Sequence, residues 1–279
     1  MAVLAIDAGT SVVKAAVFAD GTELAGVGVP TPSLRPRPGH REQDMTATWQ
    51  AVVQAVRSVV RRAGVPVTAL ATTAQGDGCW LVDERLDPVG PAILWNDGRA
   101  ASIVSRWQRD GALARGYARN GSAGFAGLLN AILAWLVAHE PDRLTRARAA
   151  LTCNGWLHAA LTGHAAADAS DASAPFLDLT TGRYAEDLVE LFGVAEHARL
   201  LPEILDDPVH PLTARAAGDL GLPPGIPVVM APYDVPATAL GLGVTDIGQA
   251  YCVLGTTLCA AAPVAGRPDG GEPAGLTLS

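Results

Sequence analysis

The chain has 279 residues, of which 49% are hydrophobic and 5% aromatic, and its formal net charge is −8. This composition is typical of a globular protein, and the length allows one large domain or two. Lys14 is the only lysine and acidic residues outnumber basic ones, which argues against a surface that neutralises a nucleic-acid backbone.

Cysteine spacing and hydropathy exclude further classes. The four cysteines form no C-x-x-C pair, which predicts neither a disulfide framework nor a zinc site. The N-terminus lacks the basic segment of a signal peptide, and the longest apolar helix-like run, 128–138, is too short to cross a bilayer. We therefore expect a cytoplasmic protein with no nucleic-acid or membrane partner.

Three apolar strands are predicted first: one that ends at Asp7, one over 12–18 and one over 23–29. Between the first two lies a turn of Gly9, Thr10 and Ser11, where small residues let backbone N–H groups approach a phosphate and the hydroxyls add donors. Asp7, at the end of its strand, is suited to hold Mg²⁺ through water. The alternative is an ordinary hairpin.

A Pro-rich loop over 30–40 precedes a predicted helix that begins after the N-cap Asp44 and ends at Gly64. Strands are then predicted over 67–73, 79–82 and 92–94.

Polar residues follow two of these strands. Gln75 and Asp77 follow the strand over 67–73, and Trp95 and Asp97 follow the segment over 92–94. Ligands of open α/β sheets bind outside the carboxyl ends of strands, so these four residues are candidates for one binding site. As alternatives, Trp95 could belong to the core, and Asp97 could form only a local ion pair with Arg99.

The rest of the chain is predicted to be largely helical. Helices are expected over 102–109, 125–139, 150–161 and 184–192, with a small-residue loop over 168–178.

A strand over 226–230 then delivers Asp234, which precedes a small-residue helix over 236–242. A final strand over 249–254 leads into Gly255, Thr256 and Thr257, whose turn chemistry repeats that of residues 9–11. The repeat predicts two related lobes that clamp a polyphosphate.

Together these pieces resemble the FGGY carbohydrate kinases of the actin-like ATPase superfamily. The segments that carry the resemblance are AIDAGTSVVKAAVFADG, GHREQDMTATWQ, AQGDGCWLVDERLDPVGPAILWNDGRA, WLHAALTG with the following Asp168 and Ser173, APYDVPATALGLG and VLGTT. The resemblance implies an α/β fold of the ribonuclease H-like, actin-like ATPase type, with a mixed central sheet flanked by helices. It also implies a sugar-binding N-terminal domain over 1–246 and the beginning of a nucleotide-binding domain over 247–279.

The implied activity is ATP-dependent phosphorylation of a hydroxyl of a small polyol or sugar in carbohydrate catabolism, with ATP and Mg²⁺ as cofactors. By the resemblance, Asp234 is the catalytic base and also contacts the substrate; its alternative role is to cap the following helix. Asp7 would anchor Mg²⁺, and Lys14 would either contact phosphate or be a solvated strand residue. The remaining implied contacts are Gly9, Thr10, Ser11, Gly255, Thr256 and Thr257 for phosphate, and Gln75, Asp77, Trp95 and Asp97 for the polyol.

Within the family, the turn over 75–78, the LLPEI segment over 200–204 and the HPL segment over 210–212 are most similar to erythritol kinases. Xylulose kinases typically carry Gln-Met-His-Gly at this turn, and glycerol kinases carry an arginine. A four-carbon polyol is therefore the first expectation, and a xylulose- or ribulose-type ketopentose the second.

Members of the family are considerably longer, and their Gly-rich adenosine-binding segment is absent here, so we expect a truncated polypeptide that is inactive alone. A non-catalytic sugar-binding fragment is the alternative from another class; an actin-like ATPase with a protein client is disfavoured by the turns at Gln75 and Trp95. A homodimer is left open. In space, we expect Asp7 and Asp234 to emerge from neighbouring strands and to face a common crevice.

Overall fold

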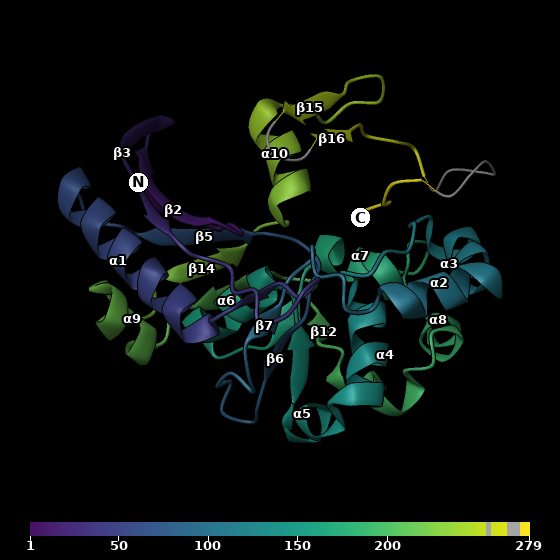
Figure 1. Ribbon diagram of the computed structural model, residues 1–279. Helices are drawn as coiled ribbons and strands as arrows, with labels where there is room; N and C mark the ends of the chain where they lie inside the picture. Colours follow the sequence, from purple (N-terminus) through teal and green to yellow (C-terminus); the bar gives the residue numbers. More distant parts are fainter. Residues whose placement is uncertain (255–257, 267–273) are drawn as a thin grey trace.

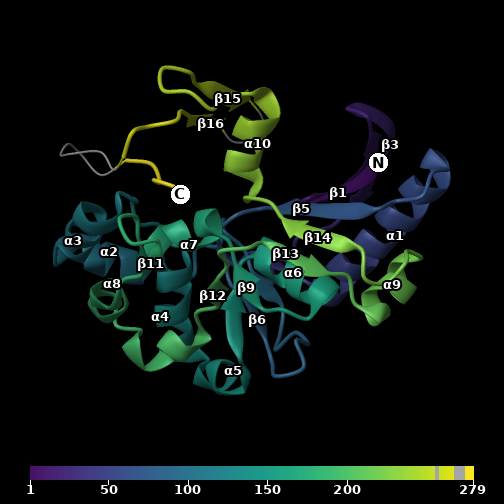
Figure 2. The ribbon, with the colours of Figure 1, turned by 180° about the vertical axis from the view of Figure 1, so that it is seen from behind.

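The computed structural model describes residues 1–254, 258–266 and 274–279 (Figure 1). A mixed sheet with the strand order β13-β14-β5-β1-β2-β3 organises the part of the molecule that contains the N-terminus. Helices α1, α6 and α9 lie on one side of this sheet, and α10 with the β15–β16 hairpin lies on the other (Figures 1 and 2). A second, mainly helical region adjoins the sheet at the end where β5 and β14 finish.

The sheet strands have these bounds: β1 Ala2–Ala8, β2 Val12–Ala19, β3 Thr22–Pro30, β5 Ala69–Ala74, β13 Val209–Pro211 and β14 Pro227–Met230. β5 is parallel to both β1 and β14, whereas the other pairings are antiparallel. In β1, alternate side chains from Ala2 to Ala8 are buried, as the alternation of a strand requires when one face is covered. The three opening strands that the sequence predicts are confirmed.

Helix α1, Met45–Ala63, covers that buried face and ends as the sequence predicts. The Asp44 carboxylate accepts a hydrogen bond from the Ala47 N–H at 2.9 Å, and Gly64 closes the helix with a φ of 65°. Val52, Val56 and Val59 have no exposed surface and belong to the core beneath the sheet. The helix therefore forms because two caps frame an apolar stripe.

The remaining elements are short. The helices are α2 Ala101–Arg109, α3 Ala112–Asn120, α4 Leu129–His139, α5 Pro141–Arg146, α6 Cys153–Thr162, α7 Ala169–Phe176, α8 Glu186–Leu191, the 3₁₀ helix η1 Ala195–Leu200 and α9 Ala214–Leu220. The strands are β4 Glu42–Gln43, β6 Trp80–Val82, β7 Ala92–Ile93, β8 Ala149–Leu151, β9 Ala166–Ala167, β10 Leu177–Asp178, β11 Arg183–Tyr184 and β12 Glu203–Ile204. Many of the helices share a second hydrophobic core that includes Trp107, Ile132 and Phe192.

Two predictions in this region are wrong. The segment 168–178 is not a loop, because the Asp168 carboxylate accepts from the Asp171 N–H at 2.7 Å and caps helix α7. The first residues of the helix expected over 150–161 lie instead in β8, which pairs with β6. Residues 149–151 are all apolar, and so short an apolar run does not separate a buried strand from the start of a buried helix.

The C-terminal elements lie apart from both cores. Helix α10, Asp234–Leu242, has no buried residue, and the hairpin of β15 (Tyr251–Leu254) and β16 (Leu258–Ala261) exposes Leu254 and Leu258. Residues 274–279 then return to the helical region, where the Ser279 N–H donates to the Ser173 hydroxyl at 2.8 Å. Across the described residues, every helix is too short or too polar to traverse a lipid bilayer.

Replacing Asp44 tests the cap that begins α1. Asp44→Ala should lower the free energy of unfolding by about 1 kcal/mol, because the Ala47 N–H loses its acceptor, whereas Asp44→Ser should retain most of it. Urea unfolding of the two variants measures the difference. Equal stability of the alanine and serine variants would contradict the assignment.

Candidate active site

Two carboxylates lie at the carboxyl ends of the parallel strands. Asp7 is near the end of β1, and Asp234 begins α10 four residues after the end of β14. The expectation that they follow neighbouring strands is wrong, because β5 lies between β1 and β14. The register nevertheless sets Asp7 opposite Thr73 and Met230 opposite Thr72, so the three strands finish at one edge.

Electrostatics also relates these two acids. Burial, followed by the negative charge of Asp7, raises the pKa of Asp234 to about 6, while Lys14 opposes the shift. Asp234 is only half-buried, and the Asp7 side chain is 29% exposed, so neither is enclosed in the core. The two carboxylates thus share one environment at the sheet edge.

The turn between β1 and β2 has the properties of a phosphate-binding turn. The Gly9 N–H donates to the Val12 carbonyl at 3.2 Å, and a Cβ on Gly9 would lie 3.0 Å from that oxygen. Within the described residues, the backbone N–H groups of Thr10 and Ser11 donate to no protein acceptor. Free amides in a tight turn are suited to anionic oxygens.

The adjacent charges fit phosphate and magnesium. The Lys14 side chain is 67% exposed, and its Nζ lies 3.0 Å from Oδ2 of Asp7, the residue directly opposite it in β1. Among the residues that the structure describes, no group of three or more His, Cys, Asp or Glu side chains is placed to bind a metal ion together. The prediction that Asp7 holds Mg²⁺ through water therefore relies on its carboxylate and the nearby phosphate-type turn.

The turn after β5 presents Asp77 beside Asp234. Asp77 and Gly78 both have left-handed backbones, with φ of 53° and 77°, and a Cβ at Gly76 would overlap the ring of Tyr233. Burial, followed by the charge of Asp234, raises the pKa of Asp77 to about 7. Carboxyls with raised pKa values that share an environment are typical of functional sites.

A closed set of hydrogen bonds joins this turn to the phosphate-type turn. Trp95 Nε1 donates to Thr10 Oγ1 at 3.0 Å, and Thr10 Oγ1 donates to Gln75 Oε1 at 2.8 Å. Gln75 Nε2 donates to Gln43 Oε1 at 2.9 Å, and Gln43 Nε2 donates to the Thr10 carbonyl at 3.3 Å. The structure therefore brings Thr10, Gln75 and Trp95 together, with Gln75 buried and Trp95 half-buried.

Gln43 is absent from the candidates derived from the sequence. It directly precedes the helix cap Asp44, and nothing in its local pattern separates it from an ordinary polar residue before a helix. Its burial, with 1% of its surface exposed, becomes visible only in the structure.

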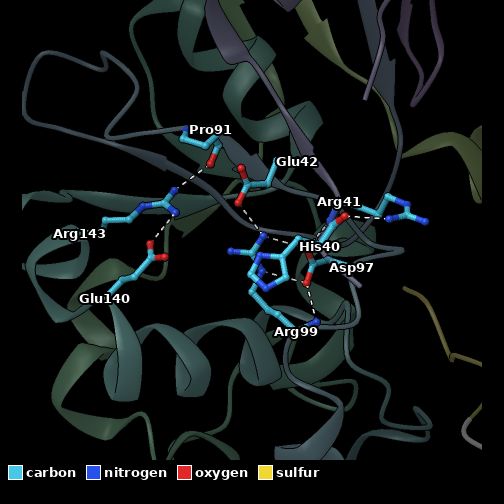
Figure 3. A network of polar contacts seen from close by, with 8 residues as sticks. All are labelled: His40, Arg41, Glu42, Pro91, Asp97, Arg99, Glu140 and Arg143. Atoms are coloured by element: carbon cyan, nitrogen blue, oxygen red, sulfur yellow. Dashed lines mark hydrogen bonds and ion pairs between the residues drawn. The ribbon is translucent and has the colours of Figure 1, made fainter. Parts of the chain in front are cut away.

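Asp97 lies in a different setting from the other candidates (Figure 3). Its side chain has no exposed surface, and it accepts hydrogen bonds from the Arg41 N–H at 2.6 Å and from the backbone N–H, Nε and Nη2 of Arg99. Arg99 also pairs with Glu42 at 2.7 Å and lies over the ring of Trp135. For Asp97 the structure therefore contains the alternative, an ion pair with Arg99.

Helix α7 adds further acids next to the site. Burial, followed by the charge of Asp168, raises the pKa of Asp171 well above its ordinary value, and the charges of Asp77 and Asp234 act in the same direction. The Tyr233 N–H donates to Ser170 Oγ at 3.1 Å, which attaches α7 to the chain just before Asp234. The sequence does not reveal this contribution, because the small residues over 168–178 predict a loop.

Two cavities of the described structure lie away from this site. A cavity of about 580 Å³ lies between α8, η1 and β12, and one of about 380 Å³ lies between α1, α6 and α9. Neither is lined by Asp7, Asp77 or Asp234, so the site is defined by its side chains and backbone turns. The predicted phosphate contacts Gly255, Thr256 and Thr257 lie outside the described residues.

The fold and this site define a class of protein: an α/β domain of the actin-like ATPase fold. A xylulose kinase from Rhodospirillum rubrum superposes with a TM-score of 0.84 at 27% identity, covering 90% of this chain and 54% of that one. The predicted fold class is confirmed.

The sequence comparisons identify the family. Residues 2–241 match the N-terminal domain of the FGGY family of carbohydrate kinases. Erythritol kinase from Brucella abortus is 37% identical over 263 residues, which cover 91% of this chain and 51% of the relative. L-xylulose/3-keto-L-gulonate kinase from Escherichia coli is 32% identical, over 96% of this chain and 55% of the relative. The chain belongs to the FGGY family of carbohydrate kinases, and it spans about half the length of the curated relatives it matches.

The raised pKa of Asp77 predicts how stability depends on pH. The unfolded carboxyl ionises near 3.8 and the folded one near 7, so the folded state binds more protons between these values and loses stability as pH rises through them. Asp77→Asn should remove this contribution to the dependence of stability on pH. Because the variant has no carboxylate to bury at pH 8, its Tm there should be higher by at least about 2 °C.

Thermal unfolding between pH 4.5 and 8 measures this effect. Glu84→Gln is the matched control, since the Glu84 side chain is 82% exposed. Parallel curves for Asp77→Asn and the wild-type chain would contradict the raised pKa of Asp77.

The approach of Gly76 to Tyr233 gives a second prediction. Gly76→Ala should cost about 1–3 kcal/mol of stability, because the added methyl group overlaps the Tyr233 ring. Gly218→Ala in α9 meets no atom within 4 Å and should be neutral or stabilising. Urea unfolding compares the two, and an equal response would refute the close approach.

Proposed function

We propose that the protein carrying this domain is an ATP-dependent kinase that phosphorylates a hydroxyl of a small, uncharged polyol or sugar, with an erythritol-like four-carbon polyol as first choice. The observation that carries the proposal is the placement of Asp7, the turn over 9–11, Asp77 and Asp234 at one edge of the sheet. Family membership supports phosphoryl transfer, and erythritol kinase among the relatives supports the first choice of substrate.

Asp234 is the proposed base. A pKa of about 6 leaves it largely ionised at pH 7 and still able to take up a proton, which suits a group that accepts one from the attacking hydroxyl. As the first residue of α10, Asp234 does not act as the N-cap, which is Tyr233. This position argues against the alternative that Asp234 serves only to cap α10.

The phosphate side of the site uses donors from the first turn. The free amides of Thr10 and Ser11, next to Gly9, would bind oxygens of the transferred phosphate, and Lys14 would add positive charge. Asp7 would hold Mg²⁺ through water, and the bound Mg–ATP supplies the phosphoryl group. We also propose that Gly255, Thr256 and Thr257 contact the nucleotide phosphates.

The polyol side uses Gln75, Asp77, Trp95 and Asp234. Gln75 is 2% exposed, so a polyol hydroxyl would bind its Oε1 by displacing the Thr10 hydroxyl. An ionised Asp77 can accept hydrogen bonds from two hydroxyls, and the half-buried Trp95 offers an apolar face to carbon atoms. Asp97 is kept as a supporting residue, because Arg41 and Arg99 already occupy its oxygens.

Charge narrows the substrate class. The charge of Asp234 raises the pKa of Asp77, and the charges of Asp168, Asp77 and Asp234 raise the pKa of Asp171. The charge of Asp7 raises the pKa of Asp234. A substrate that carries its own carboxylate would add a further negative charge at this place. Uncharged polyols are therefore preferred, with uncharged ketopentoses such as xylulose or ribulose second.

Other predictions are retained as parts of the proposal. We place the boundary between the sugar-binding domain, 1–246, and the beginning of the nucleotide-binding domain, 247–279, where α10 leads into the β15–β16 hairpin. The family match, which ends at residue 241, supports this position. A cytoplasmic location and a homodimer also stay predictions.

Substitution of Asp234 separates a kinase from a non-catalytic sugar-binding protein. In a full-length protein with this domain, Asp234→Asn should lower kcat by about 10²- to 10⁴-fold, since the hydroxyl proton loses its acceptor. Calorimetry on the present chain should show erythritol affinity within about threefold of wild type for Asp234→Asn and at least about tenfold weaker for Asp77→Ala, which loses a charged acceptor.

The outcomes are distinct. Polyol binding without phosphoryl transfer by the wild-type full-length protein would favour the sugar-binding alternative. Normal turnover of Asp234→Asn would refute the base, and tighter binding of a sugar acid than of erythritol would refute the preference for an uncharged substrate.

A further inference from the structure

Four side chains connect the turn over 75–78, here called the polyol turn, to the turn over 9–11, here called the phosphate turn. The donor and acceptor of each hydrogen bond in this set follow from the Thr10 carbonyl at one end and the Trp95 indole at the other. The Thr10 carbonyl can only accept, so the Gln43 amide must present Nε2 to it and Oε1 to Gln75. Gln75 must then present Nε2 to Gln43, which leaves its Oε1 for the Thr10 hydroxyl. The Trp95 indole N–H can only donate, and it supplies the remaining bond to Thr10 Oγ1.

This direction determines where the proton of the Thr10 hydroxyl points. It is directed to Gln75 Oε1, so in this state the hydroxyl is not a donor toward the phosphate side. If the Gln75 amide were reversed, its NH₂ would face Thr10, and the hydroxyl proton would have to turn elsewhere. Gln43 is the residue that prevents this reversal.

Gln43 is itself held in place. It lies in β4, where it is paired with Ala92, and the preceding Glu42 forms a 2.7 Å ion pair with Arg99. The Leu94 N–H donates to the Arg41 carbonyl at 3.0 Å, so the strand that carries Gln43 is attached to the segment that carries Trp95. The ion-pair network of Figure 3 thereby supports both Gln43 and Trp95.

We propose that Gln43 is a positioning residue: by bonding both Gln75 and the Thr10 carbonyl, it fixes the Gln75 amide and the Thr10 hydroxyl in one orientation and so couples the polyol turn to the phosphate turn. The identity of the two ligands rests on the proposed function, whereas the bonded arrangement does not. When a polyol hydroxyl binds Gln75 and competes for Oε1, the Thr10 hydroxyl proton is released toward the phosphate turn. Binding of the polyol thereby changes the direction in which the Thr10 hydroxyl donates, next to the place where the phosphate binds.

The first experiment needs no ligand. In ¹⁵N NMR spectra of this chain, the Trp95 indole N–H resonance is assigned by its loss in Trp95→Phe, and its exchange with water is measured. Gln43→Met keeps the side-chain length and removes both bonds, so exchange of the Trp95 indole N–H should become about tenfold faster, the factor expected for loss of about one buried hydrogen bond. Gln43→Glu keeps the acceptor for Gln75 but cannot donate to Thr10, and it should give an intermediate effect.

Gln54→Met is the matched control, because Gln54 is exposed on α1 and should leave the Trp95 indole unchanged. Thermal unfolding establishes that each variant is folded, and if Gln43→Met is not folded, Gln43→Glu decides. A Trp95 indole whose shift and exchange are the same in the folded Gln43 variant as in wild type would overturn the proposal.

The second experiment adds erythritol. In the wild-type chain the Trp95 indole and the backbone amides of Thr10 and Ser11 should all shift. In Gln43→Met the indole should still shift, while the response of the Thr10 and Ser11 amides should fall at least about threefold. An undiminished response at Thr10 would overturn the coupling. If wild type binds neither erythritol nor xylulose, the proposed function fails, and the exchange rates still decide the role of Gln43.

Discussion

The parallel pairing of β5 with β1 on one side and β14 on the other determines where every candidate residue lies. The Gln75 N–H donates to the Ala8 carbonyl at 3.1 Å, and the Ala231 N–H donates to the Thr72 carbonyl at 2.9 Å, so the three strands leave the sheet in register. The Thr73 hydroxyl adds a bond to the Pro232 carbonyl. Acids and amides far apart in sequence meet because these strand ends share one edge.

Concentrating carboxyls at that edge has an energetic cost. Asp77 and Asp171 lose hydration and lie near other acids, which is why their pKa values rise. The surrounding fold holds them by backbone contacts, such as the bond from Tyr233 to Ser170, and by the tight approach of Gly76 to Tyr233. Groups with raised pKa values that lie near one another are typical of functional sites.

Sequence reasoning succeeds where local signals are strong. The caps of α1, the first three strands and the acids at strand ends were all predicted, because capping residues, alternation and turn glycines are local features. It failed for α7, whose residues are small and include Pro175, and whose stability depends on Asp168 and on contacts from distant elements. Likewise, the chain alone does not distinguish Asp77, which lies among other acids, from Asp97, which is neutralised by Arg99, since both follow apolar strands.

The weak packing of α10 has a mechanical consequence for the residue at its start. Tyr233 is 5% exposed and anchored to α7, whereas the helix that follows has no buried residue. A rotation of α10 would therefore pivot about its first turn, displacing Leu242 much more than Asp234. The Asp234 carboxylate lies at this pivot, so whatever is attached to the far end of α10 would move toward or away from the sheet while Asp234 stays in place.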